Sequence, residues 1–133
     1  MIPAPVFLGL AGWLAAIGFA VTFSLPLGLK LLGVDGESWR AVMRFHYPLG
    51  LSILLIALAH AWIPLFSGQL MRVFGLGIAL GFAAYVLMAI QCGLGLLLYR
   101  AGSASPKVRR VHLATMTLLA LVIAGHAGLY LLR

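Results

Sequence analysis

The sequence predicts an all-α protein, a transmembrane four-helix bundle whose helices run alternately up and down. Of its 133 residues, 64% are hydrophobic and only 8% are charged, whereas a water-soluble domain carries about a quarter charged residues. The mean hydropathy is +1.15, and a fold of this size has too little interior to hide so much apolar surface. The apolar residues also fall into four stretches, each longer than the about 20 residues that cross a hydrocarbon core.

The first expected span covers residues 6–32 and is interrupted only by Pro26 and Lys30. It lacks the basic start and the short apolar segment of a cleaved signal peptide, so we expect it to remain as a helix. The second, third and fourth spans cover residues 42–66, 73–99 and 111–132. They are predicted to be helices because backbone in lipid must satisfy its own hydrogen bonds, and no sustained alternation of period two indicates strands.

The connections at 34–40, 67–72 and 100–110 contain the Gly, Ser, Pro and charged residues that are typical of loops. Connections this short make neighbouring helices antiparallel. We find no internal repeat beyond helix pairs and no soluble domain, so residues 1–133 are expected to form one domain.

The net charge of +7 is distributed unevenly over this topology. The side with both termini and the 67–72 connection carries Arg72 and Arg133. The opposite side carries seven basic residues: Lys30, Arg40, Arg44, Arg100, Lys107, Arg109 and Arg110. Basic loops stay in the cytoplasm, so the 33–41 and 100–110 loops are predicted to be cytoplasmic and both termini to be outside. No basic stripe with interleaved aromatic residues indicates nucleic-acid binding.

Histidine occurs four times, and all four copies lie in the second and fourth spans. His46 and His60 are fourteen residues apart, and His112 and His126 repeat that spacing. Fourteen residues return a helix to within about 40° of its starting direction and advance it by roughly 21 Å. Because the two spans run in the same direction, we expect two pairs at two depths: His46 with His112 near the cytoplasm, and His60 with His126 near the outside.

Two facing imidazoles can serve as the axial ligands of a haem iron, and the flat apolar macrocycle suits the interior of a helical bundle. We therefore expect two haem b groups, with His46, His60, His112 and His126 as the metal ligands. Alternatives are chlorophyll ligation by single histidines, a proton path, and structural hydrogen bonds between helices. A single metal site using all four histidines is excluded by the separation of roughly 21 Å. The chain has one cysteine, Cys92, so covalent haem attachment through a Cys-x-x-Cys-His motif is also excluded.

A macrocycle between helices needs small residues where the helices would otherwise touch. Glycines that are expected to provide this room are Gly50, Gly81, Gly95 and Gly125. Gly81 and Gly95 are again fourteen residues apart in the third span. The alternative is that these glycines serve ordinary helix packing, since small residues are common at membrane helix interfaces.

Arginines precede the first histidine of each span and are candidates for binding haem propionates. Arg44 stands two residues before His46, and Arg109 stands three before His112. The alternative is that they act only as topology signals or as side chains that extend to the membrane surface.

The paired histidines, the segment "RFHYPLG" at 44–50 and the Gly81/Gly95 pair resemble the haem-binding half of cytochrome b in the bc complexes. The architecture is similar, more loosely, to that of ferric reductases, NADPH oxidases and small bacterial b-type cytochromes. The resemblance covers nearly the whole chain, but its specific part is the four histidines and a few flanking residues. It implies a membrane cytochrome with two stacked bis-histidine haems, and we expect it in a bacterial inner membrane.

The expected function is electron transfer across the bilayer, because an iron with two axial histidines has no open position for oxygen. Such a carrier needs an electron donor and an acceptor, either another protein subunit or a quinone. The chain would then be a membrane subunit of a redox complex or a quinone-linked oxidoreductase. Candidates for contacting a quinone ring are Gln91, Tyr85, Trp39 and Tyr47, although aromatic residues at such depths usually anchor the helix at the interface.

The alternative from another class is a pigment-binding or structural membrane subunit without redox activity. A transporter is disfavoured because the only carboxylates, Asp35 and Glu37, lie in one connection and none lies within a span.

Overall fold

The computed structural model describes residues 4–66, 75–100 and 105–132, and they form four helices. These are α1 (Ala4–Leu31), α2 (Gly36–Phe66), α3 (Leu76–Arg100) and α4 (Pro106–Leu131). All four are long and apolar enough to cross a membrane, and the described residues include no strand. The prediction of an all-α transmembrane bundle is confirmed, and the chain is an integral membrane protein.

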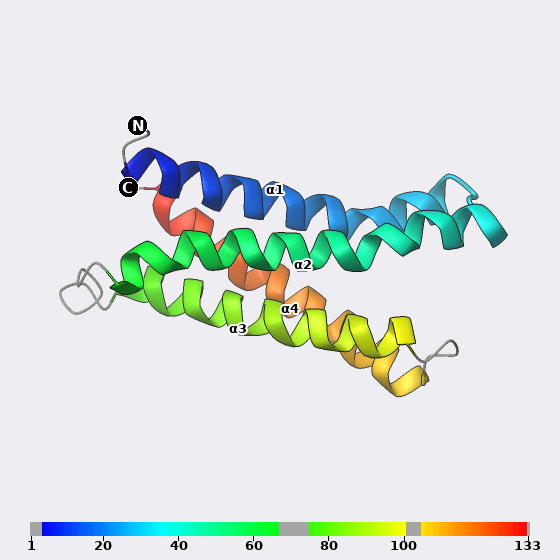
Figure 1. Cartoon of the computed structure of the whole chain (residues 1–133). Helices are drawn as coiled ribbons and strands as arrows, with labels where there is room; N and C mark the ends of the chain where they lie inside the picture. Colours follow the sequence, from blue (N-terminus) through cyan, green and yellow to red (C-terminus); the bar gives the residue numbers. More distant parts are fainter. Residues whose placement is uncertain (1–3, 67–74, 101–104, 133) are drawn as a thin grey trace.

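The helices run alternately in opposite directions, so that α1 begins and α4 ends at the same end of the bundle (Figure 1). Helices that follow one another in the chain pack together: α1 on α2, α2 on α3, and α3 on α4. The packing is most extensive within the two hairpins, α1–α2 and α3–α4. The fold is therefore two helical hairpins joined along α2 and α3.

Two helices begin more than one helical turn before the start that the apolar pattern predicted. The second was expected from residue 42 and begins at Gly36, and the fourth was expected from residue 111 and begins at Pro106. The assignment of 34–40 and of 105–110 to loops was thus wrong for most of these residues. A helix can continue past its apolar segment where water or lipid headgroups form hydrogen bonds with the free backbone groups at its end. Proline is well suited to a first helical turn, as at Pro106.

The seven basic residues assigned above to one side all lie at one end of the bundle, near the ends of α1 and α3 and the starts of α2 and α4. We call this the basic end. The predicted 67–72 connection, with Arg72, and the last residue, Arg133, lie outside the described residues.

The turn between α1 and α2 is formed by backbone hydrogen bonds around Gly33. The amide of Gly33 donates to the carbonyl of Lys30 at 3.1 Å, and the amide of Val34 donates to that of Leu29 at 2.9 Å. Gly33 has a φ of +68°, a left-handed conformation that glycine adopts without steric cost. This pair of bonds is the Schellman arrangement, which satisfies the last carbonyls of a helix and here reverses the chain into α2.

The most buried side chains lie halfway along the bundle. Ile53 lies midway between the two histidines of α2 and is 4% exposed, and Leu119 lies midway between the two of α4 and is fully buried. They pack with Ala15, Ala84 and Met88 from α1 and α3. Seven residues make about two helical turns, so each of these side chains points in nearly the same direction as the histidines before and after it.

Candidate functional site

The structure brings His60 of α2 and His126 of α4 together. Their ring centres are 6.4 Å apart and their planes meet at 82°. The two residues come from separate hairpins, so this contact depends on the packing of the whole bundle. It juxtaposes the two histidines that were expected to form the pair far from the basic end.

A glycine of the neighbouring helix lies directly against each of these rings. A Cβ atom on Gly12 of α1 would be 2.8 Å from Cε1 of His60, and one on Gly81 of α3 would be 2.9 Å from Cε1 of His126. Real Cβ atoms essentially never approach other atoms so closely. The two rings therefore occupy the space that a Cβ at Gly12 or Gly81 would need, and both hairpins have this arrangement.

The ring of His126 is oriented by a backbone carbonyl. Its Nδ1 lies 2.8 Å from the carbonyl oxygen of Gly77. A carbonyl only accepts hydrogen bonds, so Nδ1 carries the proton and Nε2 keeps a free lone pair. Histidines that ligate metals commonly donate their second N–H in this way. Tyr130, one turn further along α4, packs its ring edge against His126 with the centres 5.2 Å apart.

The other pair, His46 and His112, lies nearer the basic end. Gly95 of α3 lies between the segments that carry them, since its Cβ would be 3.8 Å from Cε1 of His112 and 3.8 Å from Cδ2 of Tyr47, the residue after His46. In the described part of the chain, the Nδ1 atoms of His46 and His112 are buried without a hydrogen-bond partner. A buried nitrogen without a hydrogen bond lowers the stability of the fold. Each of these two nitrogens is therefore free to bind a further group.

The remaining predicted glycines have other surroundings. Nothing lies within 4 Å of a Cβ on Gly50, and a Cβ on Gly125, the residue before His126, would meet Leu80 of α3 at 3.6 Å. Arg44 and Arg109 are exposed at the basic end. The structure thus places Gly81 and Gly95 of α3 against histidines of α4, and the roles of Gly50 and Gly125 stay predictions.

Two of the residues considered for a quinone already have partners. The amide of Gln91 is bonded to α4 through both its nitrogen and its oxygen. Tyr47 stacks on Tyr99 with ring centres 5.8 Å apart. Tyr85 and Trp39 are half-buried.

Gly12 is the site residue that sequence reasoning missed. The first span has no glycine pair at the fourteen-residue spacing, so none of its glycines was singled out. Its position in the hairpin could have identified it. Gly12 lies about as many residues before the α1–α2 turn as His60 lies after it, and residues in such positions face each other in an antiparallel hairpin.

His60 and His126 bring two imidazole donors together in the bundle. Among the described residues, no group of three or more His, Cys, Asp or Glu side chains could hold a metal ion. A haem needs only two, because its porphyrin supplies the other ligands. Two imidazoles whose ring centres are 6.4 Å apart could each supply one nitrogen to a haem iron.

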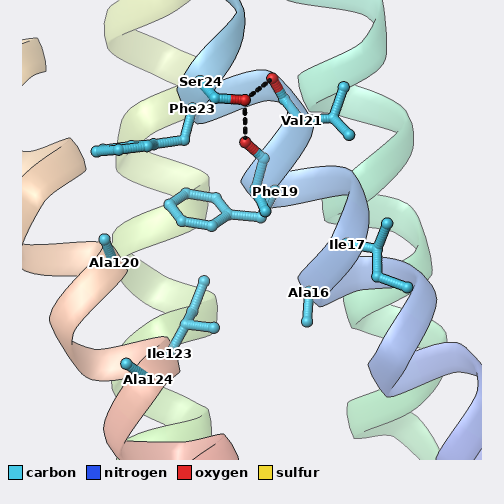
Figure 2. A pocket seen from close by; sticks show the side chains of 10 residues that line it. Ala16, Ile17, Phe19, Val21, Phe23, Ser24, Ala120, Ile123 and Ala124 are labelled. Carbon is cyan, nitrogen blue, oxygen red and sulfur yellow. Dashed lines mark hydrogen bonds between the residues drawn. The ribbon is translucent and has the colours of Figure 1, made fainter.

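One hollow lies away from the histidines, between α1 and α4. It is a groove of about 620 Å³ lined by Phe19, Phe23, Ala120, Ile123 and their neighbours (Figure 2). The hydroxyl of Ser24 donates back to the carbonyls of its own helix, at 2.8 Å to Ala20 and 3.2 Å to Val21. The groove is therefore an apolar surface with no histidine in its lining, and the bundle is less closed between α1 and α4 than between its other neighbours.

Comparison of the chain with protein-family models, with curated proteins and with solved structures finds no match. The functional argument accordingly depends on the arrangement of the side chains described above.

Proposed function

We propose that the protein is a di-haem b-type cytochrome that carries electrons across a membrane. In this proposal His46 and His112 hold one haem, and His60 and His126 hold the other. The single observation that carries it is the His60–His126 pair, whose rings are 6.4 Å apart and lie against Gly12 and Gly81. Nearer the basic end, Gly95 lies against both His112 and Tyr47, the residue after His46, which supports a second site of the same kind.

A haem held by such a histidine pair would supply reversible one-electron transfer. The chain itself provides the ligands, sets their separation and excludes water. Ile53 and Leu119, with 4% and 0% exposure, fill the bundle between the two histidine layers. These apolar side chains occupy the bundle between the two layers. The low polarity around each site is one of the means by which a protein sets a redox potential. Arg44 and Arg109 are the cations proposed to bind the propionates.

Two further parts of the proposal concern the setting of the protein. The resemblance to cytochrome b and small bacterial b-type cytochromes supports a bacterial inner membrane, with the basic end in the cytoplasm. The electron donor and acceptor would be another protein subunit or a quinone, so the chain would serve as a subunit of a redox complex or of a quinone-linked oxidoreductase. An apolar exterior, such as exposed Leu121 and Leu118, supports lipid as the surrounding medium.

The proposal is tested by purifying the full chain in detergent and measuring its haem content and its reduced-minus-oxidised spectrum. We expect two haems per chain and a b-type spectrum. A green preparation with a chlorophyll spectrum would favour the pigment-binding alternative. A colourless preparation, from cells supplied with ample haem, would favour a structural subunit.

Ligand pairing is tested by His46→Ala. Because His46 and His60 serve different sites, we expect this change to remove one haem and to leave the other in place. His60→Ala is the matched variant and should remove the complementary haem. Retention of both haems in either variant would contradict the pairing.

A further inference from the structure

A polar side chain lies in the middle of α3 among apolar neighbours. Gln91 is half-buried, nine residues before the last residue of α3, within a segment apolar enough to span the membrane. Its Nε2 donates a hydrogen bond to the backbone carbonyl of His112 on α4 at 2.9 Å. Its Oε1 lies 2.6 Å from the hydroxyl of Thr115, also on α4. Polar groups at such depths are costly and usually functional.

The Gln91–Thr115 pair has only one consistent arrangement of protons. A carbonyl can only accept, so the amide nitrogen of Gln91 must face His112, and the amide oxygen must then face Thr115. The Thr115 hydroxyl therefore donates to Gln91, although the carbonyls of Val111 and His112 are also within reach at 2.9 and 3.1 Å. The amide thus joins α3 to two positions of α4, at His112 and one turn further along.

The two histidines of α4 are held by different means. His126 is oriented through its ring, whose Nδ1 is bonded to the Gly77 carbonyl. The Nδ1 of His112 has no partner among the described residues, and its nearest glycine, Gly95, is in ordinary contact at 3.8 Å. The position of the His112 ring is therefore set through its backbone, and Gln91 bonds to that backbone.

We infer that Gln91 and Thr115 are positioning residues that fix the depth and rotation of His112 as a haem ligand. This inference rests on the proposed function and adds a mechanism to it. The hydrogen bonds of Gln91 reach α4 at His112 and Thr115, whereas His126 lies fourteen residues after His112 in the same helix. Removal of the Gln91–Thr115 pair should therefore affect the His46–His112 haem and spare the other.

The test uses the full chain in its haem-loaded form, with Gln91→Leu and the milder Thr115→Val. Each haem is assigned first, by its loss in His46→Ala or in His60→Ala. The readouts are the midpoint potential of each haem and the low-field electron paramagnetic resonance signal of each ferric haem. That signal depends on the angle between the two imidazole planes, so it reports ligand orientation rather than overall stability.

In Gln91→Leu we expect a shifted resonance and a shifted midpoint for the His46–His112 haem, with about tenfold faster loss of that haem to a competing haem acceptor. Both signals of the His60–His126 haem should stay unchanged. Thr115→Val should cause a smaller shift of the same kind, and Thr115→Ser should restore the parent signals because it keeps the hydroxyl. If the two residues act as a unit, the double variant should be no worse than Gln91→Leu alone.

Thr117→Val is the matched control, since Thr117 is an exposed threonine of α4 whose hydroxyl donates only to Leu113 of its own helix at 3.1 Å. It should leave both haems unchanged. Equal shifts at both haems, or shifts at neither, would overturn the inference while leaving the cytochrome assignment intact. A parent chain without haem would overturn the proposed function first, so the two failures are distinguishable.

Discussion

At the scale of single residues, the arrangement depends on glycines as much as on histidines. Gly12 and Gly81 lie where a Cβ would come within 3 Å of an imidazole. Each of the two hairpins pairs a glycine on its first helix with a histidine on its second. A side chain at either position would have to displace a ring whose placement defines the proposed ligand geometry.

We therefore expect Gly12→Ala and Gly81→Ala to lower haem occupancy at the His60–His126 site while preserving the fold. The added methyl group pushes the ring, which is the movable end of a side chain, and alanine is a better helix residue than glycine by about 1 kcal/mol. Haem content and thermal unfolding of the purified variants measure the two effects separately.

Gly50→Ala and Gly93→Ala are the controls for this comparison, because nothing lies within 4 Å of a Cβ at either position. They should retain two haems. Equal haem loss in the control variants would show that the contact with the ring is not the cause.

At the scale of helices, the hairpin is the repeating unit. The α1–α2 turn reverses the chain through the left-handed Gly33 and its Schellman hydrogen bonds. The direction in which α2 leaves this turn determines which residues of α2 contact α1. The turn therefore contributes to the contact between Gly12 and His60. A change at the turn should affect the stability of the hairpin, although the turn lies far from that contact.

Gly33→Ala is expected to lower the free energy of unfolding by about 1 kcal/mol, because a residue with a Cβ is strained at a φ of +68°. Gly28→Ala is the matched control, since Gly28 is a helical residue of α1 with nothing within 4 Å of its Cβ. Unfolding of both variants in mixed detergent micelles gives the comparison. A Gly33→Ala protein as stable as Gly28→Ala would contradict this account of the turn.

At the scale of the whole molecule, charge and packing are both uneven. The basic residues gather at one end of the bundle. On the side, α1 and α4 are separated by the apolar groove of Figure 2. The first asymmetry supports an orientation in the membrane, because basic segments are retained on the cytoplasmic side.

The orientation is tested with single cysteines in a Cys92→Ser background. We expect Asp35→Cys, in the turn at the basic end, to react in intact cells only with a membrane-permeant maleimide. A cysteine appended after Arg133 should also react with an impermeant maleimide, because both termini are predicted to be outside. The reverse pattern would show that the basic end faces outward.

Much of the fold could be predicted because it depends on local composition. The four spans follow from runs of apolar residues, and their alternating direction follows from the short connections between them. The starts of α2 and α4 could not be located in this way, since Gly36–Ala41 and Pro106–Arg110 are helical without being predominantly apolar. Hydropathy marks where a helix meets lipid, whereas the helix itself ends where its backbone hydrogen bonds end.

The arrangement of the four histidines in two layers follows from the spacing alone, because the helical period places residues fourteen positions apart on nearly one face. The glycine beside each ring, the hydrogen bond from Gln91 to the backbone at His112, and the groove between α1 and α4 follow from how the helices pack. These features depend on the rotation and shift of one helix against another. Rotation and shift are set by the combined packing of side chains from separate segments, which no local pattern specifies.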